Sequence, residues 1–521
     1  MQDTISGRHV AVSRRWRVVR RRTIAGALGL ALIVVPATSP AFAARPLTST
    51  YCASSGAAPS DTCYGTNALA SENGGYENSA FGEDALTSNT TGHANTADGD
   101  TALYLNTTGA YNTASGFEAL YANTTGHENV ADGSQSLSNN GTGYYDTAVG
   151  TNSMINTSSG YQDTAIGDSA LYSNTTGNSN TVLGFEALAG NTTGSDNTAL
   201  GLNAMQNSNV NADTAVGEAA LANDQGSHNA ATGYDALTAN TAGNNNVADG
   251  SLSLLHNTTG YYNTGIGAAA LANNTTGTDD TALGYDAMAN TNVSGDTAVG
   301  ENTLASDQGY NNTATGFFAL PANTTGHENV ADGYWALFHN TTGYYDTAMG
   351  VNSLINTTSG YQDTSIGDSA LYGNTTGNNN TALGFEAGAN GSNANTTGSN
   401  NTFIGYGAAP GTSTQLTNAT AIGANAAVGE SNALVLGGTG ADAVNVGIGT
   451  QSPLSLLQVG QPGTSYGSYV QIPTVTASGP PPASDCNNAT LVGRMVLQYV
   501  ASKGTMTLWS CSAAGKWVVT K

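Results

Sequence analysis

A glycine recurs every 16 or 17 residues through most of this chain, from Gly82 to Gly384. Asn or Asp stands four residues before each of these 19 glycines, and Leu or Met stands four residues after 18 of them. A short fixed period with fixed small residues is typical of a solenoid, in which each repeat buries its apolar side against its neighbours. The sequence therefore predicts a long stacked structure rather than a globular catalytic core.

One repeat reads Asn-Thr-Thr-Gly-x-x-Asn/Asp-Thr-Ala-x-Gly-x-x-Ala-Leu-x-x, and residues 106–122 are a clean copy. Turn residues separate two segments that we expect to be short strands, Asn/Asp-Thr-Ala-x-Gly and the segment around Ala-Leu. We therefore expect an all-β fold, a parallel β-solenoid in the form of a left-handed β-roll with about 17 residues per coil. A three-sided left-handed helix is the alternative, although its six-residue subperiod is not visible.

Two columns of the repeat are candidates for structural roles. The Leu/Met column is expected to form a continuous core stripe, because no other large apolar residue is kept in nearly every coil. The Asn/Asp column is expected to form a ladder of amides and carboxylates about 4.8 Å apart. The core stripe includes Leu103, Leu120, Leu137, Met154, Leu171 and Leu188. The ladder includes Asn95, Asn112, Asn129, Asp146, Asp163, Asn180 and Asn197.

The positions that flank the strand alanine give further clues to the surface. The Thr position is filled by Val at 130, 247 and 330, which suggests a packed, half-buried site. The residue before the glycine is mostly Ile, Val, Leu or Met, but it is Asp at 98, 132, 249 and 332. The sequence does not fix the face of this position. An apolar column interrupted by Asp suggests a subunit interface or a partly wet seam.

The first 43 residues have the features of a secretory signal. A basic segment around Arg14–Arg22 precedes an apolar stretch, Ile24–Val35, that is too short to span a bilayer comfortably. Ala41 and Ala43 then form an A-x-A cleavage site. A twin-arginine signal and an ordinary Sec signal both fit this segment. We therefore expect an exported bacterial protein, at the cell surface or secreted, with no membrane span in the mature chain.

The mature chain is strongly acidic. Only 5 basic residues remain against 35 acidic ones once the signal is removed, a formal net charge of about −30. No Lys or Arg lies between Arg45 and Arg494, so the repeats cannot neutralise phosphates. This excludes nucleic acid as a partner and disfavours anionic membranes. An acidic surface also keeps long solenoids soluble.

Four cysteines lie in two pairs, one at each end of the repeat array: Cys52 with Cys63, and Cys486 with Cys511. In an exported protein such pairs predict two disulfides that close small terminal modules. Other connectivities stay open, and a metal site is the weaker interpretation. The predicted organisation is a signal peptide at 1–43, an N-terminal cap with a Cys pair at 44–74, and the β-roll array at 75–440. A neck or linker at 441–478 and a C-terminal β-hairpin module at 479–521 follow.

Part of the array is duplicated. The segment Gly116–Ala187 recurs nearly unchanged at Gly316–Ala387, 200 residues later. The array therefore grew partly by duplication of blocks of coils, which changes length more readily than chemistry.

The repeated motif of the type Asp163-Thr164-Ala165-Ile166-Gly167 resembles the head domains of YadA-like trimeric autotransporter adhesins, over roughly residues 75–440. The resemblance implies a left-handed parallel β-roll, a homotrimer and cell adhesion. The segment Val446–Pro453 resembles a segment of bacterial and phage trimeric fibre proteins. The chain departs from the adhesins at its C-terminal end, where about 45 residues with one hairpin are too few for their four-stranded membrane anchor.

Nothing in the repeat predicts an enzyme, a cofactor or a metal site. The motif Gly463-Thr464-Ser465-Tyr466-Gly467 matches a nucleophile elbow, but no histidine follows His339 to act as its base. We therefore expect a surface adhesin or structural fibre, with a host-cell, matrix or glycan ligand. The alternatives are a secreted monomer that binds ice or polysaccharide through its Thr rows, and a phage-like fibre component. Tyr pairs such as Tyr144-Tyr145 could stack on sugars or partner surfaces.

Overall fold

The computed structural model describes residues 58–389, 391–439, 442–448, 450–453, 457–459, 474–476, 495–500, 505–512 and 516–519. All of them belong to one unit of the chain, Thr50–Lys521. The described residues include one short 3-10 turn within the array, η1 (Gly391–Asn393). None of their helical structure is long and apolar enough to cross a membrane.

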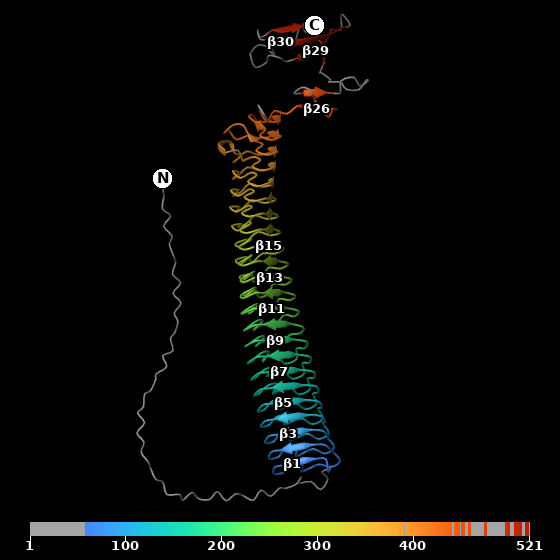
Figure 1. The fold of residues 1–521 in the computed structure, drawn as a ribbon. Coiled ribbons are helices and arrows are strands. Elements are labelled where there is room, and N and C mark those ends of the chain that lie inside the picture. The colour runs from blue at the N-terminus through green and yellow to red at the C-terminus, as the bar shows by residue number, and fades with distance from the viewer. Residues whose placement is uncertain are drawn as a thin grey trace, which may run out of the picture. The chain divides into compact units, whose positions relative to one another are not determined.

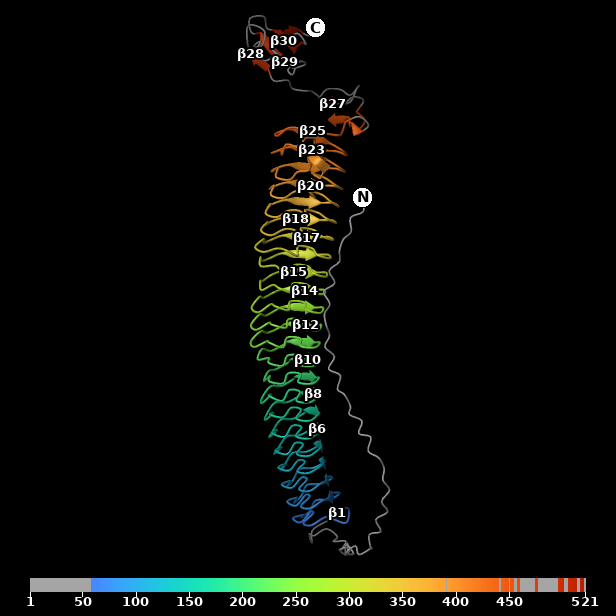
Figure 2. The same cartoon turned by 90° about the vertical axis from the view of Figure 1, so that its left-hand side faces the viewer.

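The repeat array folds as an all-β parallel β-solenoid with about 17 residues per coil, which confirms the predicted solenoid and its coil length (Figures 1 and 2). Each coil contributes one three-residue strand to a 23-stranded sheet. The first half of this sheet is β1 (Thr62–Tyr64), β2 (Ser79–Phe81), β3 (Thr96–Asp98), β4 (Thr113–Ser115), β5 (Val130–Asp132), β6 (Thr147–Val149), β7 (Thr164–Ile166), β8 (Thr181–Leu183), β9 (Thr198–Leu200), β10 (Thr214–Val216), β11 (Ala230–Thr232) and β12 (Val247–Asp249). The second half is β13 (Thr264–Ile266), β14 (Thr281–Leu283), β15 (Thr297–Val299), β16 (Thr313–Thr315), β17 (Val330–Asp332), β18 (Thr347–Met349), β19 (Thr364–Ile366), β20 (Thr381–Leu383), β21 (Thr402–Ile404), β23 (Thr420–Ile422) and β25 (Leu434–Leu436).

Each strand pairs in parallel with the strand of the next coil, in register. In one such pair, Thr147 lies beside Thr164 and Val149 beside Ile166. The middle residue, usually Ala, points inward and is buried, while its two neighbours face outward. The sheet already includes β1, inside the segment predicted as a cap, and it ends at β25, close to residue 440.

The second strand predicted in each coil, around Ala-Leu, is absent from most of the described array. Two residues of that segment adopt left-handed backbone angles, as at Glu118 (φ 55°) and Leu120 (φ 50°), and these angles prevent an extended strand. Backbone hydrogen bonds still join the coils there, since Leu103 N–H donates to Ala119 O at 3.0 Å. The predicted strand forms only near the end of the array, where β22 (Ala409–Pro410) pairs with β24 (Ala427–Val428).

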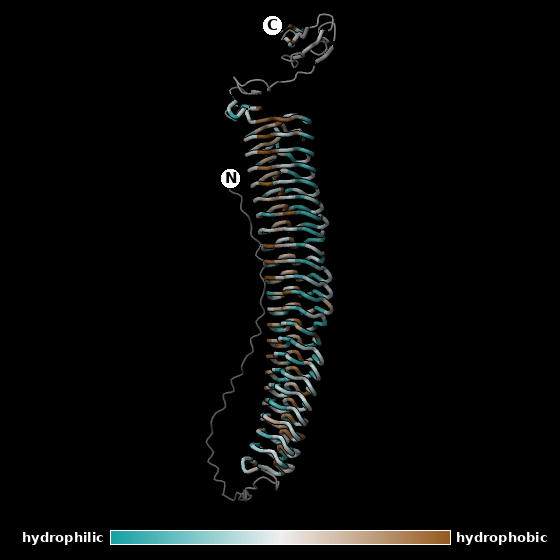
Figure 3. Tube along the Cα trace, turned by 90° about the vertical axis from the view of Figure 1, so that its right-hand side faces the viewer, coloured by the Kyte–Doolittle hydropathy of each residue, from teal (hydrophilic) through white to brown (hydrophobic). Residues whose placement is uncertain are grey.

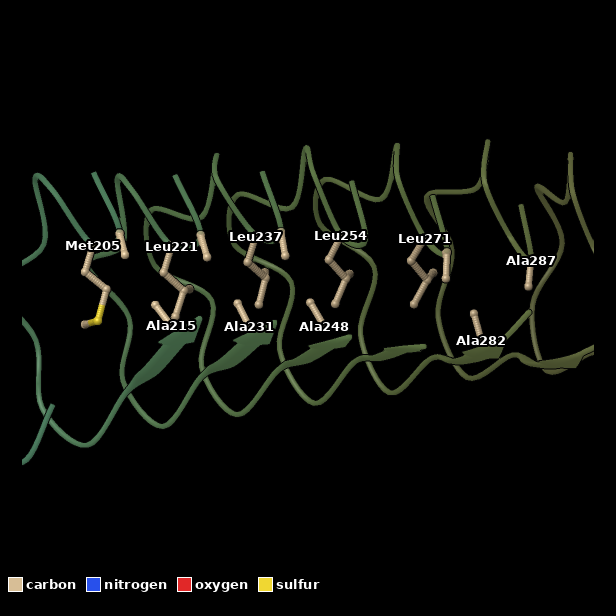
Figure 4. Packing of buried hydrophobic residues seen from close by; sticks show 14 of the residues in the cluster. Met205, Ala215, Leu221, Ala231, Leu237, Ala248, Leu254, Leu271, Ala282 and Ala287 are labelled. Atoms are coloured by element: carbon tan, nitrogen blue, oxygen red, sulfur yellow. The ribbon is translucent and has the colours of Figure 1, made fainter. Parts of the chain in front are cut away.

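The core is a column of Leu or Met side chains facing a column of strand alanines. All six residues of the predicted core stripe are fully buried. Figure 4 shows Leu221, Leu237 and Leu254 extending across the coil toward the alanines of the strands. Because this position has a positive φ, β-branched residues are strained there, which explains why Leu and Met occupy it and Ile and Val do not.

The repeating glycine is required by both backbone geometry and stacking. Gly116 has φ 129°, and a Cβ there would lie 2.6 Å from the carbonyl oxygen of Gly133 in the next coil. A side chain at this position would therefore force adjacent coils apart, which explains the strict period of the sequence.

One coil departs from the pattern. Gly388 stands where the coils from Gly82 to Gly367 carry Leu or Met, and Phe403 in β21 stands where most strands carry Ala. A Cβ on Gly388 would lie 2.8 Å from Leu371 Cδ2 and 3.0 Å from Phe403 Cδ2. The buried Phe403 ring therefore fills the space left at Gly388. The large side chain that Leu supplies in other coils is supplied here by Phe403 on the facing strand.

Short strands follow the solenoid. The strands β26 (Val446–Ile448) and β27 (Leu457–Val459) pair in parallel. A separate four-stranded sheet contains β28 (Thr474–Thr476), β29 (Met495–Val500), β30 (Thr505–Cys511) and β31 (Trp517–Val519). The strands β29 and β30 form an antiparallel hairpin within it.

Candidate functional surfaces and buried ladders

The Asn/Asp column forms a hydrogen-bonded ladder inside the solenoid. The Oδ1 atom of Asn95 accepts hydrogen bonds from the backbone N–H of Asn112 at 3.0 Å and from its Nδ2 at 3.1 Å. The Nδ2 group of Asn112 also donates to Gly126 O at 2.9 Å. All seven predicted ladder residues are buried. Each amide thus satisfies backbone groups that would otherwise be unpaired away from water.

A second buried ladder, which the sequence analysis missed, runs beside the first. It is formed by the Asn of the Asn-Thr-Thr-Gly segment, seven residues after the repeating glycine. Asn123 Nδ2 donates to Asn106 Oδ1 at 2.7 Å. This Asn was interpreted as a turn residue. The sequence does contain one indication of this role: where the Asn is replaced, the new residue can also form hydrogen bonds, as Thr157, Ser208 and Asp224 can.

The two ladders meet at the turn glycine. Gly126 O accepts Nδ2 hydrogen bonds from Asn112 at 2.9 Å and from Asn123 at 3.0 Å. A Cβ on Gly126 would collide with Asn123 Oδ1 and with Gly143 O. The Asn-Thr-Thr-Gly segment is therefore fixed by the interior of the solenoid and not by turn geometry alone. Along most of the stack, hydrophobic residues gather toward one side of the coil and hydrophilic residues toward the other (Figure 3).

Aspartates in the first ladder are protonated more readily than ordinary aspartates. Desolvation by burial raises the pKa of Asp146 to about 8 and that of Asp163 to about 7. No described residue gives Asp146 Oδ2 a hydrogen bond. An Asn in its place would donate to Gly160 O, as Asn129 does to Gly143 O at 2.9 Å. A protonated Asp146 can donate to Gly160 O in place of that amide. An ionised Asp146 would instead place a negative oxygen against the negative end of the Gly160 carbonyl.

Further buried aspartates lie close together where the two ladders meet. Desolvation, followed by interaction with Asp224, raises the pKa of Asp213 to about 9. Desolvation and the charge of Asp307 likewise raise the pKa of Asp296 to about 9. The described residues include no group of three or more His, Cys, Asp or Glu side chains placed to hold a metal ion.

The outer face of the sheet carries two columns. Thr147, Thr164 and Thr181 lie side by side in the first column. The Val residues in this column are exposed, with 39% exposure at Val130, whereas Thr147 and Thr164 are half-buried, so the predicted half-buried site holds for only part of the column. The second column holds the residue before the glycine. It faces solvent, and Asp98 and the other interrupting aspartates are exposed there.

Aliphatic side chains form long runs in the second column. One run spans five consecutive coils, from Val149 in β6 to Val216 in β10. Leu183 in the middle of this run is 49% exposed. Another run extends from Met349 to Leu436. Contiguous apolar residues that face solvent, some exposed and some half-buried, mark interaction surfaces more often than single exposed side chains do.

The aromatic side chains at the turns stack on one another. The rings of His327 and Tyr344 are 5.1 Å apart, and those of Tyr344 and Tyr361 are 4.9 Å apart. His127, Tyr144 and Tyr161 repeat this arrangement in the duplicated block. Both faces of each central Tyr are covered by neighbouring rings, so Tyr144 and Tyr344 cannot stack on a sugar. The first Tyr of these two pairs therefore joins coils, whereas the second, Tyr145 or Tyr345, is exposed.

Several predicted residues cannot be placed. The cleavage-site residues Ala41 and Ala43 and the cysteines Cys52 and Cys486 lie outside the described residues. Cys63 is half-buried in β1, and Cys511 is buried in β30. Because one member of each pair is not described, the two disulfides stay predictions. In comparisons with protein-family models, curated proteins and solved structures, no match to this chain was found.

Proposed function

We propose that this chain is an exported surface adhesin or structural fibre that presents a repetitive acidic β-roll for multivalent attachment. The observation that supports the proposal is the outer face of the 23-stranded sheet. At about 4.8 Å per coil it extends roughly 100 Å and repeats the same two columns of side chains. Weak contacts repeated along such a rod raise avidity without any single strong site.

We further propose that the rod is a homotrimer in which this face, with its aliphatic column, is buried between copies, so that the turns of each coil are left for attachment. A face about 10 Å wide and roughly 100 Å long has an area of about 1,000 Å². Stable interfaces bury about 800 Å² on each partner, so this face is large enough to hold copies together. The two predicted disulfides, Cys52 with Cys63 and Cys486 with Cys511, would close the ends of each chain.

The test is the solution mass of residues 44–521 by light scattering, with and without reductant. We expect a trimer, and we expect Leu183→Asp combined with Ile166→Asp to dissociate it. Asp already occupies this column at four other coils, so the substitutions are compatible with the fold. Thr176→Asp, at an exposed turn position of the same region, is the matched control and should leave the mass unchanged. A monomer in all three proteins would overturn the trimer and the adhesin analogy that depends on it.

A second candidate is a secreted monomer that binds ice or polysaccharide. The observation that favours it is the outward-facing Thr column, in which Thr147, Thr164, Thr181, Thr198 and Thr214 lie side by side in register. An ice-recrystallisation assay with the wild-type chain and with a Thr164→Asp/Thr181→Asp variant tests it. Activity that the variant loses would favour this candidate, and no activity would exclude ice as the ligand.

A further inference from the structure

The longer coil after Gly384 opens a cavity on the side of the solenoid. In most coils seven residues separate the repeating glycine from the buried amide of the second ladder, whereas eleven separate Gly384 from Asn395. The cavity has a volume of about 650 Å³, and Asn356, Ser369, Tyr372, Glu386, Ala394 and Thr396 are among the residues that line it. This volume lies within the range of about 300–1,000 Å³ that is common for small-molecule sites.

The duplicated block provides an internal comparison for this cavity. Asn156, Ser169, Tyr172 and Glu186 occupy the equivalent positions 200 residues earlier. There, Gln206 Nε2 donates a hydrogen bond to Glu186 and covers its carboxylate. The residue equivalent to Gln206 is Pro410, which has no side-chain donor. Glu186 is accordingly half-buried and Glu386 is exposed.

A second difference between the two blocks accompanies the longer coil. Position 373 is Gly, whereas the equivalent residue in the earlier block is Ser173. A Cβ on Gly373 would lie 2.7 Å from the Cβ of Ala394, a residue of the longer coil. Loss of the side chain at 373 therefore makes room for the wall of the cavity. The later block therefore differs from the earlier block at the positions that form the cavity.

We propose that this cavity binds a neutral saccharide. Tyr372 is 45% exposed and offers an aromatic face for the C–H groups of a sugar ring. No described residue gives the Glu386 carboxylate a hydrogen bond or an ion pair, so its oxygens can accept from vicinal hydroxyls. Thr396 adds a further polar side chain to the lining, whereas the Ser369 hydroxyl and the Asn356 amide already donate to Asp368 and to Tyr372 O and can offer only their oxygens as acceptors. The acidic repeat has no Lys or Arg to pair with a charged sugar, which disfavours uronic and sialic acids.

This inference names a ligand class for the proposed attachment function and rests on that function for its role. The binding itself is tested on the purified mature chain by saturation-transfer NMR and calorimetry. The probes are the methyl glycosides of glucose, galactose, mannose and N-acetylglucosamine, with their β-linked trisaccharides. We expect at least one probe to bind, with at least tenfold weaker binding in Tyr372→Ala and in Glu386→Gln. Tyr172→Ala and Glu186→Gln are the matched controls and should bind within twofold of wild type.

The outcomes separate this inference from the function on which it rests. Absence of binding by every probe, or equal losses in the cavity and control variants, would overturn the saccharide site. Cell attachment that persists in Tyr372→Ala would then leave the adhesin proposal standing. Binding that depends on the cavity, with no attachment by the wild-type chain, would retain the site and reject the adhesin function. Circular dichroism of each variant separates loss of the site from loss of the fold.

Discussion

The Leu/Met column and the two Asn ladders are equally buried in the same coils, but they tolerate change in different ways. Along the Leu column the side chains alternate only between Leu and Met, and at Gly388 the volume moves to Phe403. Along the ladders, Asn gives way to Asp, Ser or Thr. The aliphatic column selects volume and backbone angle because a packed core is sensitive to side-chain shape. The ladders select hydrogen-bonding groups because a buried backbone group left unpaired costs about 1–3 kcal/mol.

Alkaline pH should give the largest difference between these two parts of the core. The pKa of Asp146 rises from about 3.9 in the unfolded chain to about 8 in the fold. Its contribution to stability is therefore complete below pH 4, declines between pH 4 and pH 8, and is lost above pH 8. At about 1.4 kcal/mol per pKa unit, ionisation of such a carboxyl costs up to about 6 kcal/mol.

The double variant Asp146→Asn/Asp346→Asn should lose less stability than the wild type as the pH rises, because two of the carboxyls that ionise are removed. Hydrogen-exchange protection of the coils around residues 146 and 346 should fall between pH 6 and pH 9 in the wild type and fall much less in the variant. The exposed Asp196→Asn is the control and should follow the wild type. Equal pH dependence in all three proteins would show that these carboxyls ionise in the fold without cost.

Asn112→Leu should destabilise its coil by about 3 kcal/mol, although it makes the interior more apolar. In the wild type the backbone N–H of Asn129 donates to Asn112 Oδ1 at 3.1 Å, and the substitution removes this acceptor. It also removes the Nδ2 donor to Gly126 O. Hydrogen exchange measured coil by coil is the appropriate readout, because solenoids can open locally. Unchanged protection around residues 112–129 would contradict a structural role for the ladder.

Leu120→Ile should cost about 2 kcal/mol and Leu120→Met less than about 1.5 kcal/mol, despite the similar size of all three side chains. Leu120 has φ 50°, which a β-branched side chain strains. Urea unfolding with hydrogen exchange of the 116–137 region compares the two variants. A smaller loss for Ile than for Met would show that volume, and not backbone angle, selects the column.

Ile166→Thr on the outer face should change the free energy of unfolding by less than about 0.5 kcal/mol, since surface substitutions away from special features usually do. Ile166 is 40% exposed, and Thr is already present in this column at Thr232 and Thr315. Thermal unfolding in a Leu183→Asp/Leu200→Asp background, which places two charges in the same run and leaves Ile166 in place, isolates this effect from assembly. A large loss there would place Ile166 in the core rather than on an interaction surface.

The parts of the fold that follow from the repeat itself were predictable. Spacing of 16 or 17 residues gave the coil, and the regular Leu or Met identified the column that the structure buries. The second strand was not predictable, because Glu118 and Leu120 adopt left-handed angles that the residue types do not announce. The second ladder was missed for a related reason, since Asn in Asn-Thr-Thr-Gly is equally suited to a turn and to a buried amide.

The sequence by itself determined the period of the coil, the residues that repeat and the acidity of the surface, because these depend only on order and composition. The tertiary structure decided which side chains meet between coils. Phe403 fills the space at Gly388, and Gln206 covers Glu186 while nothing described covers Glu386. Stacking also raises the pKa of Asp146. These effects arise only when coils lie about 4.8 Å apart and exclude water, a condition that no single repeat can create alone.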